Sequence, residues 1–259
     1  YLISHIQTVK EGNWVPIHEI PCNDEVASLL SSFNSMIAIQ TKMRDDLIEA
    51  EKLKQQLSLS LLQQQVNPHF LYNTLDNICA LAELDEKETL IQLVMNLSSF
   101  YRSSLSNGKM HISIGQELEI SRAYLEILQI RYFHKFDFTI TCPEALKNYS
   151  CIKLLLQPIL ENSIYHGIKG LDRHGILHIE AEDTGDCIRF TISDNGRGFS
   201  KEDYEKIWQQ DADHFGIKSI QQRILLYYGP GYGLSMESPQ TGGCITVITL
   251  PKQEGLPCH

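Results

Sequence analysis

The chain has 259 residues, and 32 acidic against 22 basic side chains give it a formal net charge of −10. Its composition, 42% hydrophobic and 21% charged, is ordinary for a globular protein and excludes disordered, collagen-like and disulfide-scaffold chains. The acidic balance gives no reason to expect a nucleic-acid partner, because phosphate binding needs a concentrated basic face. The length suits one large domain or two smaller ones.

Cysteine usage and hydropathy bear on the cellular compartment in which the chain is expected. Seven cysteines are scattered without a CxxC pair, which favours reduced thiols over a zinc site or a disulfide framework. No stretch approaches the roughly 18–20 apolar residues that span a bilayer, and no signal peptide is present. Because the sequence starts at Tyr1 instead of methionine, we expect it to be a fragment of a longer protein.

The N-terminal third is predicted to be helical. Residues 1–36 indicate a short helix, a connector and a second helix that starts at Asp24-Glu25. From Leu29 to Gln64 a heptad can be written in which eight of eleven core positions are apolar. This pattern favours a two-stranded coiled coil, and a long amphipathic helix within one globule stays the alternative. Pro68 interrupts the pattern and predicts a kink or a restart of the helix near Asn67.

A helical hairpin is predicted next. One helix runs to Leu84, a turn follows at 85–87, and a second helix runs from about Glu88 to Leu105. Two antiparallel helices of this length cannot bury both of their apolar stripes alone, whereas two copies form a four-helix bundle. We therefore expect a homodimer.

The remainder of the chain mixes helices and strands. The predicted elements are a helix at 115–132, a strand at 136–142, a buried helix at 151–166, strands at 175–182 and 187–193, helices at 201–208 and 216–228, and a hairpin of strands at 232–238 and 244–250. Because neighbouring strands are linked by hairpins, an α+β sandwich is predicted instead of a doubly wound parallel sheet.

Two polar motifs sit on these elements. In Asp194-Asn-Gly-Arg-Gly-Phe199 an acid ends a strand where it can accept a hydrogen bond from a base, and Gly196 and Gly198 leave room for a ring or phosphate. A tight hairpin turn is the structural alternative. Asn162 lies in a mostly apolar helix, so its amide needs a ligand or a polar neighbour. Its oxygen suits Mg²⁺, and a buried asparagine without function is the alternative.

Two further features carry possible chemistry. Gly216 begins a helix whose backbone donors suit a phosphate, and the acidic segment before it resembles either a lid or a solvated loop. His69 directly follows the helix-interrupting Pro68, and Asn73, four residues later, shares its helix face. A lone histidine on a helix is more often structural or simply exposed.

Taken in order, four segments resemble the conserved boxes of LytS/YesM-type sensor histidine kinases. NPHFLYNTLDN at 67–77 resembles the phospho-acceptor box, QPILENSIYHGI at 157–168 the N box, DNGRGF at 194–199 the G1 box and HFGIKSIQQRI at 214–224 the G2 box. The resemblance implies three parts: a HAMP-like segment and signalling coiled coil (1–50), dimerisation and histidine phosphotransfer helices (51–110), and a GHKL catalytic ATP-binding domain (111–259).

The resemblance also implies an activity and its residues. His69 would accept the γ-phosphoryl group of ATP and pass it to an aspartate of a response-regulator receiver domain. Of the site residues, Asp194 would bind the adenine amine, Asn162 would hold Mg²⁺, His166 would line the pocket, and three glycines would allow close backbone approach (Gly196, Gly198 and Gly216). The chain would be the cytoplasmic portion of a bacterial membrane sensor, attached through an upstream transmembrane segment that this sequence lacks.

Departures from the family pattern keep alternatives open. His214 replaces the usual first glycine of the G2 box, and Phe70 follows His69 where many histidine kinases have an acid, so the general base is unassigned. Asn73 is a candidate for orienting water in dephosphorylation of the regulator. A non-catalytic nucleotide-binding scaffold is the main alternative. A gyrase- or MutL-like ATPase clamp is disfavoured, since Pro158 stands where ATP-hydrolysing relatives carry an acid.

Overall fold

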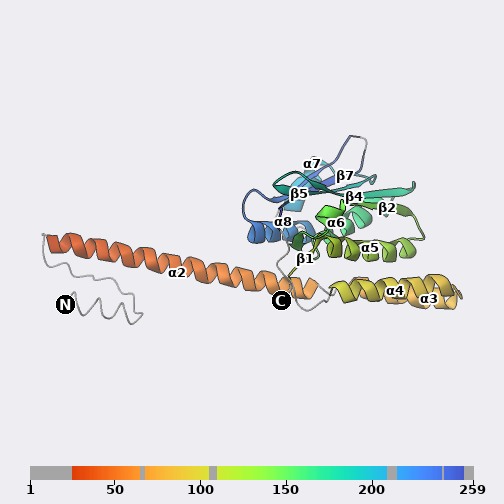
Figure 1. Cartoon of the computed structure of the whole chain (residues 1–259), viewed down its shortest axis with the longest axis horizontal. Coiled ribbons are helices and arrows are strands. Elements are labelled where there is room, and N and C mark those ends of the chain that lie inside the picture. Colours follow the sequence, from red (N-terminus) through yellow and green to blue (C-terminus); the bar gives the residue numbers. More distant parts are fainter. Residues whose placement is uncertain (1–24, 65–67, 105–109, 209–214, 241, 254–259) are drawn as a thin grey trace. The chain divides into compact units, whose positions relative to one another are not determined.

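A computed structural model of the protein describes residues 25–64, 68–104, 110–208, 215–240 and 242–253 (Figure 1). The chain divides into two units, Tyr1–Gln64 and Gln65–His259. The predicted first helix and connector lie outside the described residues. None of the helices within the described ranges combines the length and apolarity needed to cross a membrane.

The first unit contains one 40-residue helix, α2 (Glu25–Gln64), which covers the whole predicted heptad. Three apolar heptad positions, Met36, Met43 and Leu47, are 47%, 58% and 70% exposed. The described part of the chain therefore leaves these apolar side chains exposed, which is what a coiled-coil seam shows in the absence of its partner helix. Pairing with a second helix stays a prediction.

The second unit begins with the helical hairpin α3 (Pro68–Glu83) and α4 (Lys87–Ser104). Pro68 is the first residue of α3, where its missing N–H costs no helical hydrogen bond, so the predicted restart is found. The turn contains Asp85 in a left-handed conformation, at φ +57°. The hairpin matches the prediction within a few residues at each end.

The α/β part follows, and its elements are listed here in chain order: β1 (His111–Ser113), α5 (Ile114–Arg131), β2 (Phe136–Thr141), the 3₁₀ turn η2 (Glu144–Leu146), β3 (Ser150–Ile152), α6 (Gln157–Asn162), the π-helix η3 (Ser163–Ile168), β4 (Gly175–Asp183), β5 (Cys187–Asp194), α7 (Lys201–Trp208), α8 (Phe215–Tyr228), β6 (Gly233–Glu237) and β7 (Cys244–Pro251). The main sheet has the order β2-β4-β5-β7-β6, with β2 parallel to β4 and the other pairs antiparallel. This confirms the predicted α+β architecture.

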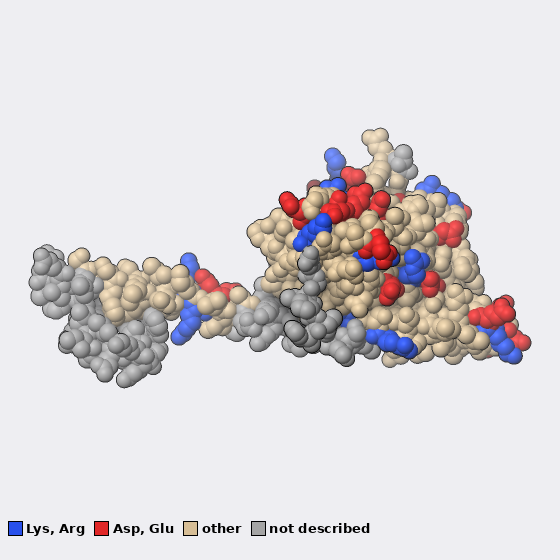
Figure 2. Space-filling view, in the orientation of Figure 1, with Lys and Arg blue, Asp and Glu red and all other residues tan. Residues whose placement is uncertain are grey.

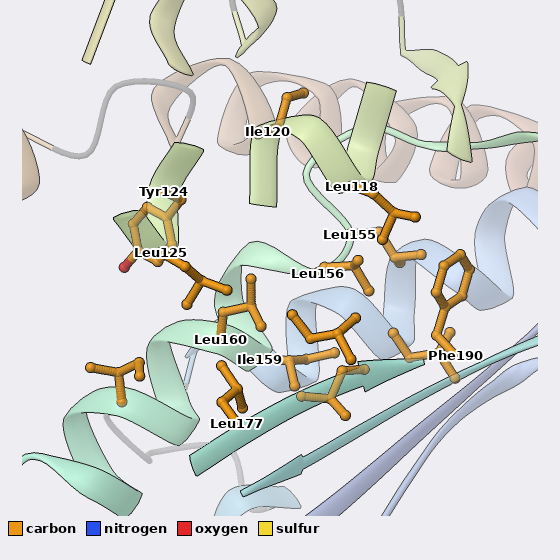
Figure 3. Packing of buried hydrophobic residues seen from close by; sticks show 14 of the residues in the cluster. Leu118, Ile120, Tyr124, Leu125, Leu155, Leu156, Ile159, Leu160, Leu177 and Phe190 are labelled. Atoms are coloured by element: carbon orange, nitrogen blue, oxygen red, sulfur yellow. The ribbon is translucent and has the colours of Figure 1, made fainter. Parts of the chain in front are cut away.

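One face of the sheet carries the core. Helices α5, α6 and α8 form a layer against it (Figure 1), and β4 alternates buried and exposed residues as a half-covered strand should. Figure 3 shows Leu125 of α5, Leu160 of α6 and Leu177 of β4 converging in this layer; each is fully buried. The two-layer sandwich thus places the α6–η3 segment directly over the ends of β4 and β5.

Helix α5 is buried on both sides, because the hairpin packs on the side away from the sheet. Tyr124 of α5 meets Phe70 of α3 and Phe100 of α4, with ring centroids 5.0 Å and 5.8 Å away, and the two phenylalanines are 5.3 Å apart. Such aromatic contacts add to the stabilisation from apolar burial. Phe70, the residue after His69, is therefore part of the core of this unit.

The predicted helix at 151–166 is wrong at its start. Residues 150–152 form the short strand β3, Leu154 is left-handed at φ +55°, and α6 begins only at Gln157. Pro158 fits this boundary, since it lies in the first turn of α6, where its missing N–H costs no helical hydrogen bond. The segment then ends as the π-helix η3, an uncommon form frequent at functional sites.

A buried carboxylate fixes the turn that leads into α6. Glu117 of α5 accepts hydrogen bonds from the backbone N–H groups of Leu154 (2.8 Å) and Leu156 (2.9 Å). Arg223 of α8 donates to the carbonyl groups of Lys153 (2.5 Å) and Leu154 (3.3 Å). Burial raises the pKa of Glu117, and those N–H groups and the charge of Arg223 oppose the rise. Helices α5, α6 and α8 are thereby tied together.

Glu117→Ala should lower the free energy of unfolding by about 3–5 kcal/mol, because it leaves Arg223 buried without its countercharge and two N–H groups without acceptors. Glu119→Ala is the matched control: Glu119 is an exposed acid on the same helix, and its loss should cost within about 0.5 kcal/mol. Urea unfolding of both variants measures the difference. Equal effects of the two substitutions would contradict the role given to Glu117.

Candidate functional site

Two adjoining cavities lie where α6 and η3 meet the ends of β5 and α8. The first, of ≈ 90 Å³, reaches Asp194, Gly198 and Phe199, and the second, of ≈ 160 Å³, reaches Pro158 and Gly216. Asn162 and His166 line both cavities, so the two adjoin at these side chains and together make up one depression. Of the residues predicted from the sequence, five line this depression (Asn162, His166, Asp194, Gly198 and Gly216).

Asp194 presents an unused acceptor to the first cavity. Its Oδ1 accepts hydrogen bonds from the N–H groups of Gly196 (2.9 Å) and Cys244 (3.3 Å). Its Oδ2 is buried and receives no hydrogen bond of acceptable geometry from the described residues. Burial raises the pKa of the Asp194 carboxyl, and a nearby Ser163 hydroxyl and the two N–H groups offset part of the rise. A buried oxygen left in this state is suited to accept a hydrogen bond from a ligand.

The loop after Asp194 lies directly against η3. A Cβ atom on Gly196 would stand 2.6 Å from both Asp194 Oδ1 and the Cα of Gly167, and Arg197 N–H donates to the Gly167 carbonyl oxygen (3.2 Å). Gly198 is left-handed at φ +71°, and a Cβ there would stand 2.3 Å from the Ser238 hydroxyl oxygen. Only glycine fits at these two positions. Gly196 does not line the cavity; it supplies the N–H that orients Asp194.

The α6–η3 segment supplies the polar wall of the depression. Asn162 ends α6, and His166 and Gly167 follow on η3 toward the same cavity. An amide oxygen is a hard ligand of the kind Mg²⁺ accepts, and Mg²⁺ needs few protein ligands when phosphates and water supply the others. The donors present therefore fit a magnesium ion carried by a phosphate ligand.

The open side of the depression is bounded by α7 and the start of α8. Asp203 of α7 lines the first cavity and accepts hydrogen bonds from the N–H (3.2 Å) and hydroxyl (2.9 Å) of Ser200. Figure 2 shows acidic side chains gathered over the part of the domain that carries α7. The acidic segment, interpreted from the sequence as either a lid or a solvated loop, begins with the short helix α7, and its remaining part, including His214, lies outside the described residues.

His69 and Asn73 lie elsewhere. His69 is exposed at the second position of α3, and neither residue lines the two cavities. Asn73 is half-buried, and its Nδ2 has no hydrogen-bond acceptor among the described residues. The structure thus gathers the candidate nucleotide residues and leaves the candidate phospho-acceptor on a separate helix.

Several lining residues were not singled out from the sequence: Glu161, Ser163, Tyr165, Arg197, Phe199, Asp203 and Cys244. Arg197 and Phe199 belong to the glycine-rich motif itself, so the motif could have included them. Nothing local marks Cys244, which reaches the cavity because β7 pairs with β5 and sets Asp194 opposite it. Burial raises the pKa of the Cys244 thiol to about 11, so it stays neutral.

Two family models match this chain. Residues 149–254 match the family described as histidine kinase-, DNA gyrase B- and HSP90-like ATPases, and this range contains the whole depression. Residues 57–136, which include α3, α4 and α5, match the histidine kinase family.

The curated proteins similar to this chain include several sensor histidine kinases. Sensor histidine kinase YesM of Bacillus subtilis is 31% identical over 228 residues, covering 88% of this chain and 39% of the relative. Sensor protein LytS of Staphylococcus haemolyticus is 27% identical over 84% of this chain and 37% of the relative. Sensor histidine kinase BtsS of Escherichia coli is 33% identical over 70% of this chain and 31% of the relative. A solved catalytic domain of histidine kinase ThkA aligns over 56% of this chain and 97% of its own, at 16% identity and a TM-score of 0.45.

The chain belongs to the LytS/YesM-type sensor histidine kinases. It spans less than two fifths of the length of the LytS relative and 39% of the YesM relative.

Proposed function

We propose that this chain is the ATP-dependent protein-histidine kinase portion of a two-component sensor. One observation carries the proposal: the buried carboxylate oxygen Asp194 Oδ2, in a glycine-lined cavity, receives no well-formed hydrogen bond from the described residues, although the Ser163 hydroxyl lies nearby. An exocyclic adenine amine supplies the missing donor. Asn162, His166, Gly198 and Gly216 extend the same depression away from Asp194, where the phosphates of ATP would lie.

Asn162 is the residue that would hold Mg²⁺. The ion would neutralise phosphate charge when bound. Gly216 leaves backbone space at the start of α8, where N–H groups and the helix dipole favour anions. A Cβ at Gly216 would contact Pro158 at 3.2 Å, so a larger residue there would press on α6.

His69 is the proposed nucleophile. A ring nitrogen of its neutral imidazole attacks the γ-phosphorus, the bond from phosphorus to the bridging oxygen breaks, ADP leaves, and the second ring nitrogen releases its proton. An aspartate of a response-regulator receiver domain then takes the phosphoryl group. Because His69 lies on α3 outside the depression, turnover requires the hairpin to move relative to the ATP site.

The hairpin also supports the proposal of a homodimer. Exposed large apolar side chains on its two helices are Tyr72, Leu75, Ile91, Val94 and Met95. A second copy would cover them in a four-helix bundle. In this proposal residues 1–50 form the HAMP-like segment and coiled coil, 51–110 the dimerisation helices and 111–259 the catalytic domain. The whole is then the cytoplasmic part of a bacterial membrane sensor.

Incubation of the full chain with γ-labelled ATP and Mg²⁺ tests the proposal. Acid-labile, base-stable label is expected on the protein, as a phosphohistidine requires. Nucleotide binding without any label, also in the presence of a receiver domain, would overturn the kinase and favour the non-catalytic scaffold.

Asn73 is proposed to orient water for dephosphorylation of the regulator, since it lies one turn beyond His69 on the same face of α3. Asn73→Ala should therefore slow dephosphorylation of a receiver domain by 10-fold or more and leave autophosphorylation within about threefold. Asn77→Ala, one turn further along α3, serves as the control. Full dephosphorylation by Asn73→Ala would contradict the role.

A further inference from the structure

A third cavity, of ≈ 200 Å³, lies on the other side of η3 from the ATP site. The end of α5, the start of β2 and η3 form its walls, and Ile164 and Ile168 of η3 form its apolar floor. None of its lining residues lines the two cavities of the ATP site. It is thus a separate space that shares only the π-helix with that site.

Its charge is one-sided. Arg131, Lys135 and Lys169 line it, its lining includes no acid, and no described carboxylate pairs with these three cations. Lys169 Nζ stands 5.9 Å from the ring centroid of Tyr132 and 5.8 Å from that of Tyr165. Arg131 donates a hydrogen bond to the Tyr165 hydroxyl (3.1 Å), which leaves its charge uncompensated. In a chain of net charge −10, three cations around one apolar cavity, without a carboxylate partner among the described residues, indicate an anionic occupant.

The backbone at the rim is held in an uncommon conformation. Phe133 and His134 are both left-handed, at φ +51° and +52°, where L-residues pay roughly 1–2 kcal/mol each. His134 N–H bonds to the Gln129 carbonyl oxygen (2.8 Å), which fixes this turn. The result is a Phe133 ring that is 85% exposed beside the cavity. A ring this exposed contributes little to the packing of the core, whereas a ligand with its own ring can stack on it.

The volume sets the size of the occupant. A dry apolar cavity of about 150 Å³ accepts one benzene molecule, so ≈ 200 Å³ accepts a single ring with one small substituent. We propose that this cavity binds a small aromatic carboxylate, with its ring over Ile164 and Ile168 and its carboxylate toward Lys135 and Lys169. A regulatory role follows, and it rests on the proposed function. An occupant of the third cavity that restricts the motion of η3 also restricts Asn162 and His166, and it thereby tightens nucleotide binding.

Isoleucine methyl NMR of the full chain tests the site, with benzoate as the probe. Benzoate should shift the Ile164 and Ile168 methyl signals with a dissociation constant on the order of 1 mM. Neutral benzamide and ringless acetate should each bind at least 10-fold more weakly. The double variant Lys135→Gln with Lys169→Gln should lose at least 10-fold in benzoate affinity, whereas Lys42→Gln with Lys87→Gln, of equal charge change, should lose none.

Absence of shifts up to 20 mM benzoate (roughly 20 times the expected constant), or equal shifts with benzamide, would overturn the site. Equal losses in the two double variants would do the same. A second arm measures affinity for ADP and Mg²⁺: saturating benzoate should tighten it at least threefold, and should have no effect in Lys135→Gln with Lys169→Gln. If benzoate binds but does not tighten ADP binding, only the proposed regulation is overturned and the binding site stands. If ADP does not bind, the proposed function is overturned, and the Ile164 and Ile168 methyl shifts still show whether benzoate binds in the third cavity.

Discussion

Replacement of His69 by glutamine is expected to abolish acid-labile labelling by γ-labelled ATP and to leave nucleotide affinity unchanged. Glutamine keeps a polar side chain but has no ring nitrogen to attack phosphorus. Because His69 is exposed on α3 and lies outside both cavities of the candidate site, the substitution removes the proposed acceptor without changing the walls of the depression. The measurements are acid-labile phosphate per chain and titration with a fluorescent ADP.

A second histidine provides the control. His174 is exposed and contacts Asp137 (3.0 Å) at the sheet, and His174→Gln should keep its label within about twofold. Label that persists in His69→Gln would place the acceptor elsewhere and contradict the assignment. Loss of both label and ADP binding in His69→Gln would show that the residue supports the fold instead.

The elements with strong local signals were predictable. Helices α3 and α4 follow from apolar periodicity and from the turn at Asp85, and β4 and β5 follow from alternation and from Gly185, which takes φ +92° between them. In each case the signal lies within the segment that it specifies, so no knowledge of tertiary contacts is needed.

Elements defined by distant partners were not predictable. Strands β1 and β3 have three residues each and exist because they pair with one another, His111 opposite Ile152, about forty positions apart. Glu117 likewise reads as an ordinary helical acid until Leu154 and Leu156 are brought to it. The π-helical end of α6 has no local signal that we can name.

In the candidate site, too, some residues could be predicted from local sequence and others could not. Asp194 was predicted from its place at a strand end before two glycines, and Asn162 because a polar group among apolar neighbours is costly; both line the depression. The side chains that complete the cavity, such as Cys244 and Asp203, come from β7 and α7, and only the sheet order brings them to Asp194. Recognition of the boxes therefore identifies the chemistry, and packing decides which further side chains share it.

Asp194→Asn should weaken ADP binding by 100-fold or more, on the order of 3 kcal/mol. An amide can keep an oxygen toward the N–H groups of Gly196 and Cys244, so the loop should stay folded. Its NH₂ group then takes the place of Oδ2 and meets the adenine amine, donor against donor. Asp183→Asn is the matched control, because Asp183 pairs with Lys252 in an exposed position at the end of the neighbouring strand. Wild-type affinity in Asp194→Asn would contradict the adenine assignment.

The same residue predicts a pH dependence with a definite sign. Burial raises the pKa of Asp194 above the usual 3.8, so acidification protonates it earlier than a free aspartate. Protonation converts an acceptor into a donor. If the adenine amine donates to Asp194 as proposed, ADP prefers the ionised form, so wild-type affinity should fall as the pH decreases through the raised pKa. Asparagine cannot ionise, and the variant should lack this component. Since titration of ADP itself affects both proteins equally, the difference between their pH profiles isolates the contribution of the Asp194 carboxylate, which we propose to meet the adenine amine.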